Sequence, residues 1–355
     1  MIAPGQREIR LSFKDLDRRA ALVGISTIIV AGCHAKAPPH ASGPVRFDTG
    51  RLAAGFAPLA VRARPGVFGF GVSSMDGAAG WVTDAKARFP LQSVFKAFLA
   101  AATLSAVDAG QLKLSEPMTL TEADLAPGAS EIADAWTGQP ITLPLIDLVA
   151  LAVQKSDNVA ADAVMKRIGG PAAVTAWLKA KGVSDISVDR YETELQPQAL
   201  GLGPFQPAWI NEKAFNAALD AIPASDREAA TARYLSDPRD TATLPAALLF
   251  LTRLAAGELI SAASTRLLLR LMTDTPTGVD RLKAGLPAGS SLAHKTGTSF
   301  TTLGITPATN DIGIATLPDG RRFAMAAFLA GSTGDDDERD ALIAEAARVA
   351  VSCVS

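Results

Sequence analysis

Cysteine and histidine are scarce in this chain, which excludes several kinds of protein. Two of its 355 residues are cysteines and three are histidines. With only Cys33 and Cys353, the chain cannot be a disulfide scaffold, so its stability must come from a hydrophobic core. The histidines, at His34, His40 and His294, lack the spacing of metal ligands. We therefore expect no metal ion and no other cofactor.

An excess of one charge is also absent. The chain has 34 Lys and Arg against 36 Asp and Glu, and it has no long basic run. Nucleic acid is therefore not an expected partner, and a small-molecule substrate is more natural. With 48% hydrophobic residues, the chain can bury the core of one large domain or of two intimately packed ones. The longest acidic run, residues 335–340, precedes an apolar helical pattern and predicts a helix start.

The first 33 residues differ from the rest. Basic residues come first, at Arg7, Arg10, Lys14, Arg18 and Arg19. An apolar stretch over residues 20–32 follows, too short to span a bilayer, so residues 1–33 are predicted to be an export signal. The signal ends in "VAGC" and resembles a bacterial lipoprotein signal, in which the cysteine, here Cys33, becomes the lipidated first residue after cleavage. The alternative is a plain signal peptide with an accidental cysteine.

We expect an exported, periplasmic protein that Cys33 anchors to the membrane. Cys353 then has no intrachain partner. Arg18 and Arg19 also resemble a twin-arginine signal, so the export route stays open. Residues 34–45, rich in Pro, Ala and Ser, are predicted to be a tether, and the folded domain is expected over residues 46–355.

Strand patterns occur near both ends of the folded domain. Residues 66–84 read as one hairpin, with "GVFGFGVSS" and "WVTD" on either side of a turn. A second hairpin is predicted where "NDIGIATL" and "RRFAMAAFLAG" flank "PDG". Apolar residues at helical spacing predict helices between the hairpins, over residues 94–109, 143–153, 159–168, 172–181, 245–256 and 262–272.

This order of strands, helices and strands predicts an α+β fold. An antiparallel sheet is built from both ends of the chain and flanked by helices, and an all-helical subdomain is inserted into it. We place the α/β part at about residues 46–90 and 274–355 and the helical part at about residues 91–273. The Pro- and Gly-rich stretch 189–244 resists assignment, apart from a short helical piece near Ala214. We expect a long loop there, of the kind that is functional or disordered.

Four short motifs carry residues suited to chemistry. "SVFK" puts Ser93 and Lys96 on one side of the first turn of a helix, close enough for the amine to take a proton from the hydroxyl. Alone, such a pair is more often a helix cap and a solvated lysine. The other motifs are "KSDN" in a turn between two helices, "RYETELQ" at the start of the long loop, and "HKTGTS" in a strand before the final hairpin.

The set S-x-x-K, S-D-N and K-T-G, in that order, resembles serine β-lactamases and penicillin-binding proteins. With Glu192 of "RYETELQ" added, residues 46–355 resemble a class A β-lactamase. The resemblance implies hydrolysis of the β-lactam amide through a serine acyl-enzyme, which inactivates the antibiotic, by a protein expected to be a monomer. A D,D-peptidase is one alternative, but it has no use for Glu192. A non-enzymatic β-lactam sensor is another, but no transmembrane segment follows the signal.

The resemblance implies roles for the first and last motifs. Ser93 is the nucleophile, and its N–H and that of Thr298 form the oxyanion hole. Lys96 is the internal base or an electrostatic partner. Ser156 relays a proton to the leaving nitrogen, and Lys295 polarises that hydroxyl and attracts the substrate carboxylate.

Further residues are implied to bind substrate and water. Asn158 offers an amide to the substrate's side chain, whereas Asp157 ties down its own turn. Glu192 is the base for the deacylating water, and Gln196 stands where the family usually has an asparagine that helps to hold this water. The substrate carboxylate is expected to meet donors from Thr296, Thr298 and Arg281.

Two loop charges match the family's ion pair that closes the neck of the glutamate loop, Arg190 and Asp240. They are separated by a longer segment than this loop normally has, so residues 204–229 are interpreted as an insertion. The insertion either decorates the surface, which we favour, or widens the pocket rim. Gln92, "HKTGTS" and "ATNDIGIATLP" further resemble the subgroup that contains extended-spectrum enzymes, although they do not define a drug spectrum.

Overall fold

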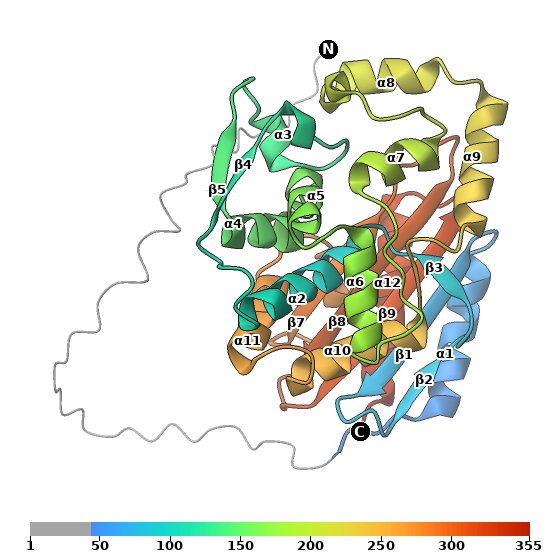
Figure 1. The fold of residues 1–355 in the computed structure, drawn as a ribbon. Coiled ribbons are helices and arrows are strands. Elements are labelled where there is room, and N and C mark those ends of the chain that lie inside the picture. Colours follow the sequence, from blue (N-terminus) through green and yellow to red (C-terminus); the bar gives the residue numbers. More distant parts are fainter. Residues whose placement is uncertain (1–43) are drawn as a thin grey trace, which may run out of the picture. The chain divides into compact units, whose positions relative to one another are not determined.

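A five-stranded antiparallel sheet forms the centre of the fold (Figure 1). The computed structural model describes residues 44–355. The strand order is β2-β1-β9-β8-β7, with β1 at Val67–Ser74, β2 at Gly80–Val82, β7 at Ser291–Thr298, β8 at Thr306–Thr316 and β9 at Arg322–Ser332. Two strands thus come from the beginning of the domain and three from its end. The predicted α+β fold, with a sheet built from both ends of the chain, is confirmed.

Pairing across the sheet joins the two predicted hairpins. β1 lies antiparallel to β9, with Val67 opposite Ala330 and Ser74 opposite Phe323. The two ends of the domain also meet directly, since the N–H of Arg46 donates to the carbonyl of Ser355 over 3.0 Å. The first few and the last described residues are therefore paired with each other. The predicted signal with Cys33, and the tether up to residue 43, lie outside the described residues.

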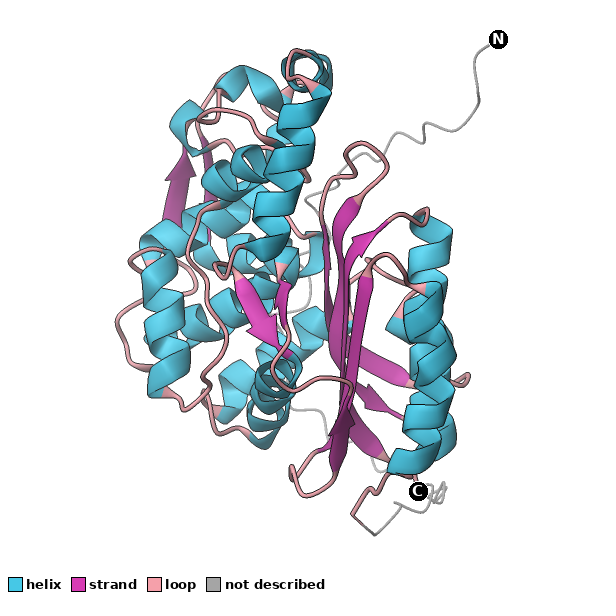
Figure 2. Cartoon of the chain, turned by 90° about the vertical axis from the view of Figure 1, so that its right-hand side faces the viewer, coloured by secondary structure: helices cyan, strands magenta, loops and turns pink. Residues whose placement is uncertain are grey.

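Helices cover both faces of the sheet (Figure 2). α1 (Thr49–Arg62) and α12 (Asp336–Cys353) pack on one face, where Leu52 and Phe56 join a core with Phe70, Met325 and Ile343. α12 starts where the acidic run predicted it. The carboxylate of Asp335 caps it by accepting the N–H of Glu338 over 2.9 Å.

α1 was not predicted, although the sequence carried a signal for it. Its buried residues Leu52, Phe56 and Leu59 recur at helical spacing. The carboxylate of Asp48 caps the helix by accepting the N–H of Arg51 over 3.0 Å. Pro58 inside the helix weakens the pattern, because proline normally ends a helix.

The other face of the sheet carries the helical part of the domain. Its helices are α2 (Phe95–Asp108), α3 (Glu131–Asp134), α4 (Leu145–Ala150), α5 (Asn158–Arg167), α6 (Pro171–Ala180), α7 (Glu192–Leu200), α8 (Glu212–Asp220), α9 (Ala224–Ser236), α10 (Leu244–Ala256) and α11 (Ala262–Thr273). Short helical turns add η1 (Gln92–Val94), η2 (Glu122–Asp124), η3 (Leu151–Lys155), η4 (Pro207–Ile210) and η5 (Leu282–Gly285). The six predicted helices are all present. This part also contains two small sheets, β3 (Arg88–Pro90) with β6 (Thr241–Thr243), and β4 (Pro117–Leu120) with β5 (Ile141–Pro144).

α2 is the central helix of this part. Every residue in its first ten positions is buried. The ring of Phe98 packs edge-on against that of Phe250 in α10, with 4.6 Å between the ring centroids. This packing fixes the start of α2, and with it the S-x-x-K motif, rigidly against the sheet.

The prediction of a long loop over residues 189–244 is wrong for most of its length, because α7, α8 and α9 occupy it. Proline and glycine here mark helix boundaries instead of preventing helices. Pro207 opens η4, Pro223 precedes α9, and Gly201 ends α7 in the left-handed conformation, with φ of +80°. Within residues 44–355, no helix combines the length and apolar character needed to cross a membrane.

Candidate active site

Ser93 lines a cavity of about 350 Å³ between the helical part and the sheet. It belongs to η1, which runs directly into α2, and its side chain is almost fully buried. The residue before it, Gln92, has a φ of +45°, in the left-handed region that non-glycine residues rarely adopt. This turn aims Ser93 at the cavity from the N-terminal end of a long helix, where the dipole favours developing negative charge.

The strand β7 approaches this turn closely, because Gly297 has no side chain. A Cβ atom at Gly297 would lie 2.5 Å from the carbonyl oxygen of Leu91. From the neighbouring strand, the amide of Asn310 donates to the carbonyls of Pro90 over 2.8 Å and of Leu91 over 3.0 Å. The K-T-G motif is thereby held beside Ser93.

Lys96 links three of the predicted motifs. Its Nζ lies 3.1 Å from Oε1 of Glu192, and both side chains are fully buried. The same amine donates to the carbonyl of Ser156 over 2.6 Å and to Oδ1 of Asn158 over 2.5 Å. A buried ion pair needs such additional hydrogen bonds to offset its desolvation. The structure thus brings these four residues together, one turn of helix from Ser93.

Lys295 lies directly behind Ser156, which lines the cavity. The Nζ of Lys295 donates to Oγ of Ser156 over 3.0 Å and to the carbonyl of Thr296 over 3.0 Å. Ser156 ends η3 with a φ of +59°, which turns its hydroxyl toward the strand. Burial, together with the charge of Lys96, holds the pKa of Lys295 well below its usual value. The amine therefore holds its proton less tightly than an exposed lysine would.

The S-D-N turn is fixed by its middle residue. Oδ1 of Asp157 accepts the N–H of Ala160 over 2.8 Å and the hydroxyl of Ser130 over 2.9 Å. Oδ2 accepts the N–H of Ile132 over 3.1 Å, and burial raises the pKa of this carboxyl. Asp157 thus holds its own turn, while Nδ2 of Asn158 donates to the carbonyl of Pro127 over 2.7 Å.

Glu192 is the first residue of α7, and Asp162 fixes its backbone. The Asp162 carboxylate accepts the N–H groups of Glu192 over 2.7 Å and of Thr193 over 3.1 Å. Burial, with the Glu192 charge beside it, raises the pKa of Asp162 to about 7, although these donors act against that rise. Asp162 was not predicted. Its only sequence signal is an aspartate within an apolar helical pattern, and the structure buries this residue completely.

Gln196, one turn after Glu192, contacts both the loop and the nucleophile turn. Its Nε2 donates to Oε2 of Glu192 over 2.8 Å and to Oε1 of Gln92 over 3.0 Å. Because Gln196 also lines the cavity, it lies where a water-holding residue is expected.

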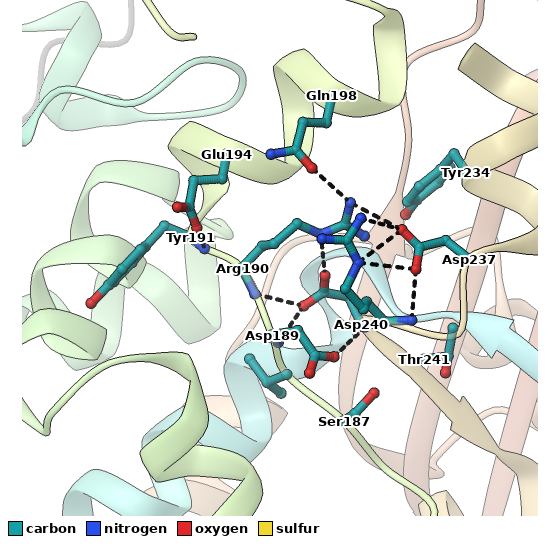
Figure 3. Close-up of polar contacts among 12 residues, drawn as sticks. Ser187, Asp189, Arg190, Tyr191, Glu194, Gln198, Tyr234, Asp237, Asp240 and Thr241 are labelled. Atoms are coloured by element: carbon teal, nitrogen blue, oxygen red, sulfur yellow. Dashed lines mark hydrogen bonds and ion pairs between the residues drawn. The ribbon is translucent and has the colours of Figure 1, made fainter. Parts of the chain in front are cut away.

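The neck of the glutamate loop is closed by Arg190 and Asp240 (Figure 3). Nε of Arg190 lies 2.6 Å from Oδ2 of Asp240, and both side chains are buried. Nη1 of Arg190 also lies 3.3 Å from Oδ2 of Asp237 and donates to Oε1 of Gln198 over 3.2 Å. Sequence reasoning named the first pair but missed Asp237 and Gln198. Asp240 itself has a φ of +52°.

The predicted carboxylate-binding residues lie together at the end of β7. Nη2 of Arg281 donates to Oγ1 of Thr298 over 2.9 Å, while its Nε pairs with Asp340 over 2.7 Å. Arg281 is therefore not a free bidentate donor, because Asp340 occupies one edge of its guanidinium. The hydroxyl of Thr277, which sequence reasoning missed, lies 2.9 Å from that of Thr296.

An aromatic pair closes one side of the cavity. Phe300 lines the cavity and packs against Phe215 of α8, with 5.3 Å between the ring centroids. Phe300 also lies close to Gly128, where a Cβ atom would be 3.5 Å from the ring. The insertion over residues 204–229 thus reaches the pocket rim through Phe215.

The whole cavity is lined by Ser93, Gly128, Ala129, Lys155, Ser156, Asn158, Gln196, Thr277, Gly278, Arg281, Thr296, Gly297, Thr298, Ser299 and Phe300. In the described part of the chain, no three His, Cys, Asp or Glu residues are grouped so that they could hold a metal ion.

The sequence of this chain is similar to those of known proteins. The model of the beta-lactamase enzyme family matches residues 52–354. The extended-spectrum beta-lactamase PER-1 of Pseudomonas aeruginosa is 32% identical over 264 residues, which are 74% of this chain and 74% of that protein. The carbapenem-hydrolyzing beta-lactamase KPC of Klebsiella oxytoca is 31% identical and covers 79% of this chain and 82% of that protein.

Solved structures of beta-lactamases also superpose on this chain. A beta-lactamase from Chitinophaga pinensis DSM 2588 superposes with a TM-score of 0.68 at 30% identity, over 84% of this chain and 97% of that one. An ancestral class A beta-lactamase of Gram-negative bacteria superposes with a TM-score of 0.68 at 31% identity, over 85% and 99%. The chain belongs to the beta-lactamase enzyme family. Its relatives place it among the class A β-lactamases, which confirms the resemblance read from the motifs.

Proposed function

We propose that this class A β-lactamase hydrolyses the β-lactam amide through an acyl-enzyme on Ser93. The observation that carries the proposal is the buried ion pair of Lys96 and Glu192, one helical turn from Ser93 and bonded to Ser156 and Asn158. Ser93 attacks the lactam carbonyl, and the N–H groups of Ser93 and Thr298 stabilise the oxyanion. The Lys96–Glu192 pair receives the proton of the Ser93 hydroxyl.

The leaving nitrogen takes its proton from the Ser156 side of the cavity. Lys295 donates to the Ser156 hydroxyl, which gives its own proton to the nitrogen. Ser156 is reprotonated with the proton that the Lys96–Glu192 pair took from Ser93, so the pair returns to its starting state and Glu192 is again a carboxylate. Lys295, Thr296 and Thr298 attract the substrate carboxylate, and Arg281 contributes through Thr298.

Glu192 then activates a water molecule that attacks the acyl ester. Its Oε2 is held by Gln196 and its Oε1 by Lys96, so the carboxylate is fixed beside the reacting centre. A penicillin-binding protein has no need of such a base, because it keeps its acyl-enzyme. This carboxylate favours hydrolysis over a D,D-peptidase or a sensor.

Turnover of a chromogenic cephalosporin tests the proposal. The purified chain is expected to hydrolyse many equivalents of the substrate within an hour. A penicillin-binding protein or a sensor would react with about one equivalent and keep it as a covalent adduct. Such a stoichiometric burst with no further turnover would overturn the proposed hydrolysis. The enzyme is further proposed to be a monomer, as the resemblance to the family implies, and sedimentation of the same preparation tests this.

We further propose that the enzyme is exported to the periplasm and anchored there by lipid on Cys33. The basic and apolar segments before "VAGC" support this, together with the scarcity of cysteine elsewhere in the chain. Mass spectrometry of the protein purified from host membranes is expected to find an N-terminal peptide that begins at a diacylated Cys33. Cys33→Ala should shift the enzyme to the soluble periplasmic fraction. An unmodified N-terminus elsewhere in the chain would remove the anchor.

A further inference from the structure

The cavity is connected to α9, outside the motifs, by a chain of buried side chains. Gln196 donates to Gln92 over 3.0 Å, and Nε2 of Gln92 donates to the hydroxyl of Tyr234 over 2.6 Å. Tyr234 lies on α9, just before the neck that Arg190 and Asp240 close (Figure 3). All three members of the chain are buried, and Gln196 lies on the cavity wall.

The amide of Gln92 has a defined orientation in this chain. Its Oε1 faces a donor, the Nε2 of Gln196, so its own Nε2 must face away and donate elsewhere. The hydroxyl of Tyr234 is the acceptor that it finds. Without that oxygen, the amide N–H would be buried without a partner, a loss that side chains relieve by rotating.

Tyr234 is suited to hold this position permanently. It is fully enclosed, and burial raises the pKa of its hydroxyl, so the group stays neutral at all working pH values. Gln92 in turn has a left-handed backbone, with φ of +45°, immediately before the nucleophile. Such strained residues persist only where their surroundings fix them, and here side chains from α7 and α9 do so.

We propose that Tyr234 is a positioning residue for deacylation, acting through Gln92 and Gln196 on the carboxylate of Glu192. When the Tyr234 hydroxyl fixes the Gln92 amide, Gln196 donates one hydrogen bond to Gln92 and one to Glu192. When Gln92 rotates, Gln196 loses that fixed partner, and the Glu192 carboxylate is aimed less often at the attacking water. The inference rests on the proposed function of Glu192.

The test is Tyr234→Phe, which keeps the ring and removes only the hydroxyl. Acylation and deacylation are measured separately, by quenching a reaction with penicillin at intervals and determining the fraction of acylated protein by intact-protein mass spectrometry. We expect deacylation to slow by about three- to tenfold, the worth of one buried hydrogen bond, while acylation stays within about twofold of wild type. Acyl-enzyme should therefore accumulate in the variant.

The matched control is Tyr191→Phe, the same change at the chain's other tyrosine. Its hydroxyl takes no part in the hydrogen bonds that join Gln92, Gln196 and Glu192, so both rates should stay at the wild-type value. A second variant, Gln92→Ala, should slow deacylation in the same way. Adding Tyr234→Phe to it should cause no further loss, because Tyr234 acts through Gln92.

Three results would overturn the inference. One is wild-type deacylation in Tyr234→Phe, and another is an equal fall of both rates, which indicates a smaller active fraction. The third is a full additional loss in the double variant. A wild-type protein that never forms or never releases the acyl-enzyme would instead overturn the proposed function itself.

Discussion

Ser93→Ala abolishes both the turnover of β-lactams and their covalent attachment to the protein. The acyl bond needs an oxygen nucleophile at the start of α2, and no other hydroxyl group stands one turn before the buried Lys96. We expect hydrolysis to fall to the uncatalysed background. Intact-protein mass spectrometry after incubation with penicillin should show only the unmodified mass.

A matched control is available on the same helix. Ser105→Ala removes the same hydroxyl group from α2, but Ser105 does not line the cavity, so this variant should keep wild-type turnover. A penicilloyl adduct on Ser93→Ala would contradict the assignment, because a second nucleophile would then have to serve.

Glu192→Ala is expected to be acylated at Ser93 and to release product about 10² to 10⁴ times more slowly, the usual loss for a general base. The oxyanion hole and Lys96 remain in this variant, whereas the carboxylate that activates water does not. Acyl-enzyme should accumulate to nearly one equivalent within the mixing time and persist. Acylation and deacylation are both followed by quenching the reaction at intervals and measuring the mass of the intact protein by mass spectrometry.

Removing Glu192 also leaves Lys96 charged and buried without its partner, which costs about 3–5 kcal/mol of stability. Glu192→Gln keeps the shape of the side chain and should show the same trapped adduct with a smaller loss of thermal stability. The control is Glu228→Ala in α9, because Glu228 is exposed and does not line the cavity.

Other outcomes assign the base differently. Wild-type release by Glu192→Ala, without adduct, would mean that another group activates the water. A variant that never acylates would point to Glu192 as the acylation base or to a collapsed loop. Far-ultraviolet spectra and thermal melting distinguish these two, since only a collapsed loop changes them beyond the cost of the lost ion pair.

The sequence predicted those parts of the site whose residues are close together along the chain. Ser93 and Lys96 are neighbours on one helix turn, and Lys295, Thr296 and Thr298 are neighbours on one strand. Their side-chain directions follow from the helix and strand periods alone. The hairpins and six of the helices were predictable for the same reason.

The missing parts depend on contacts between distant segments. Asp162 meets Glu192 thirty residues later, and Tyr234 meets Gln92 across 142 residues. No local pattern records such pairs, because the packing of α5, α7 and α9 decides them. In residues 189–244, α8 matches the short helical piece expected near Ala214. The helices α7 and α9 were missed for a different reason, since the prolines and glycines at their ends resembled those of a loop.

The pairing of β1 with β9 also determines when the enzyme can first become active. Val67 is made early and its partner Ala330 near the end, so the sheet cannot close until almost the whole chain is available. The cavity around Ser93 is complete only when β7 lies beside it, because β7 supplies Gly297 to the cavity wall and Lys295 to the Ser156 hydroxyl. Contacts of such long sequence separation make folding slow and cooperative. An incomplete chain therefore carries the nucleophile but no catalytic centre, and activity arises in one late step of folding.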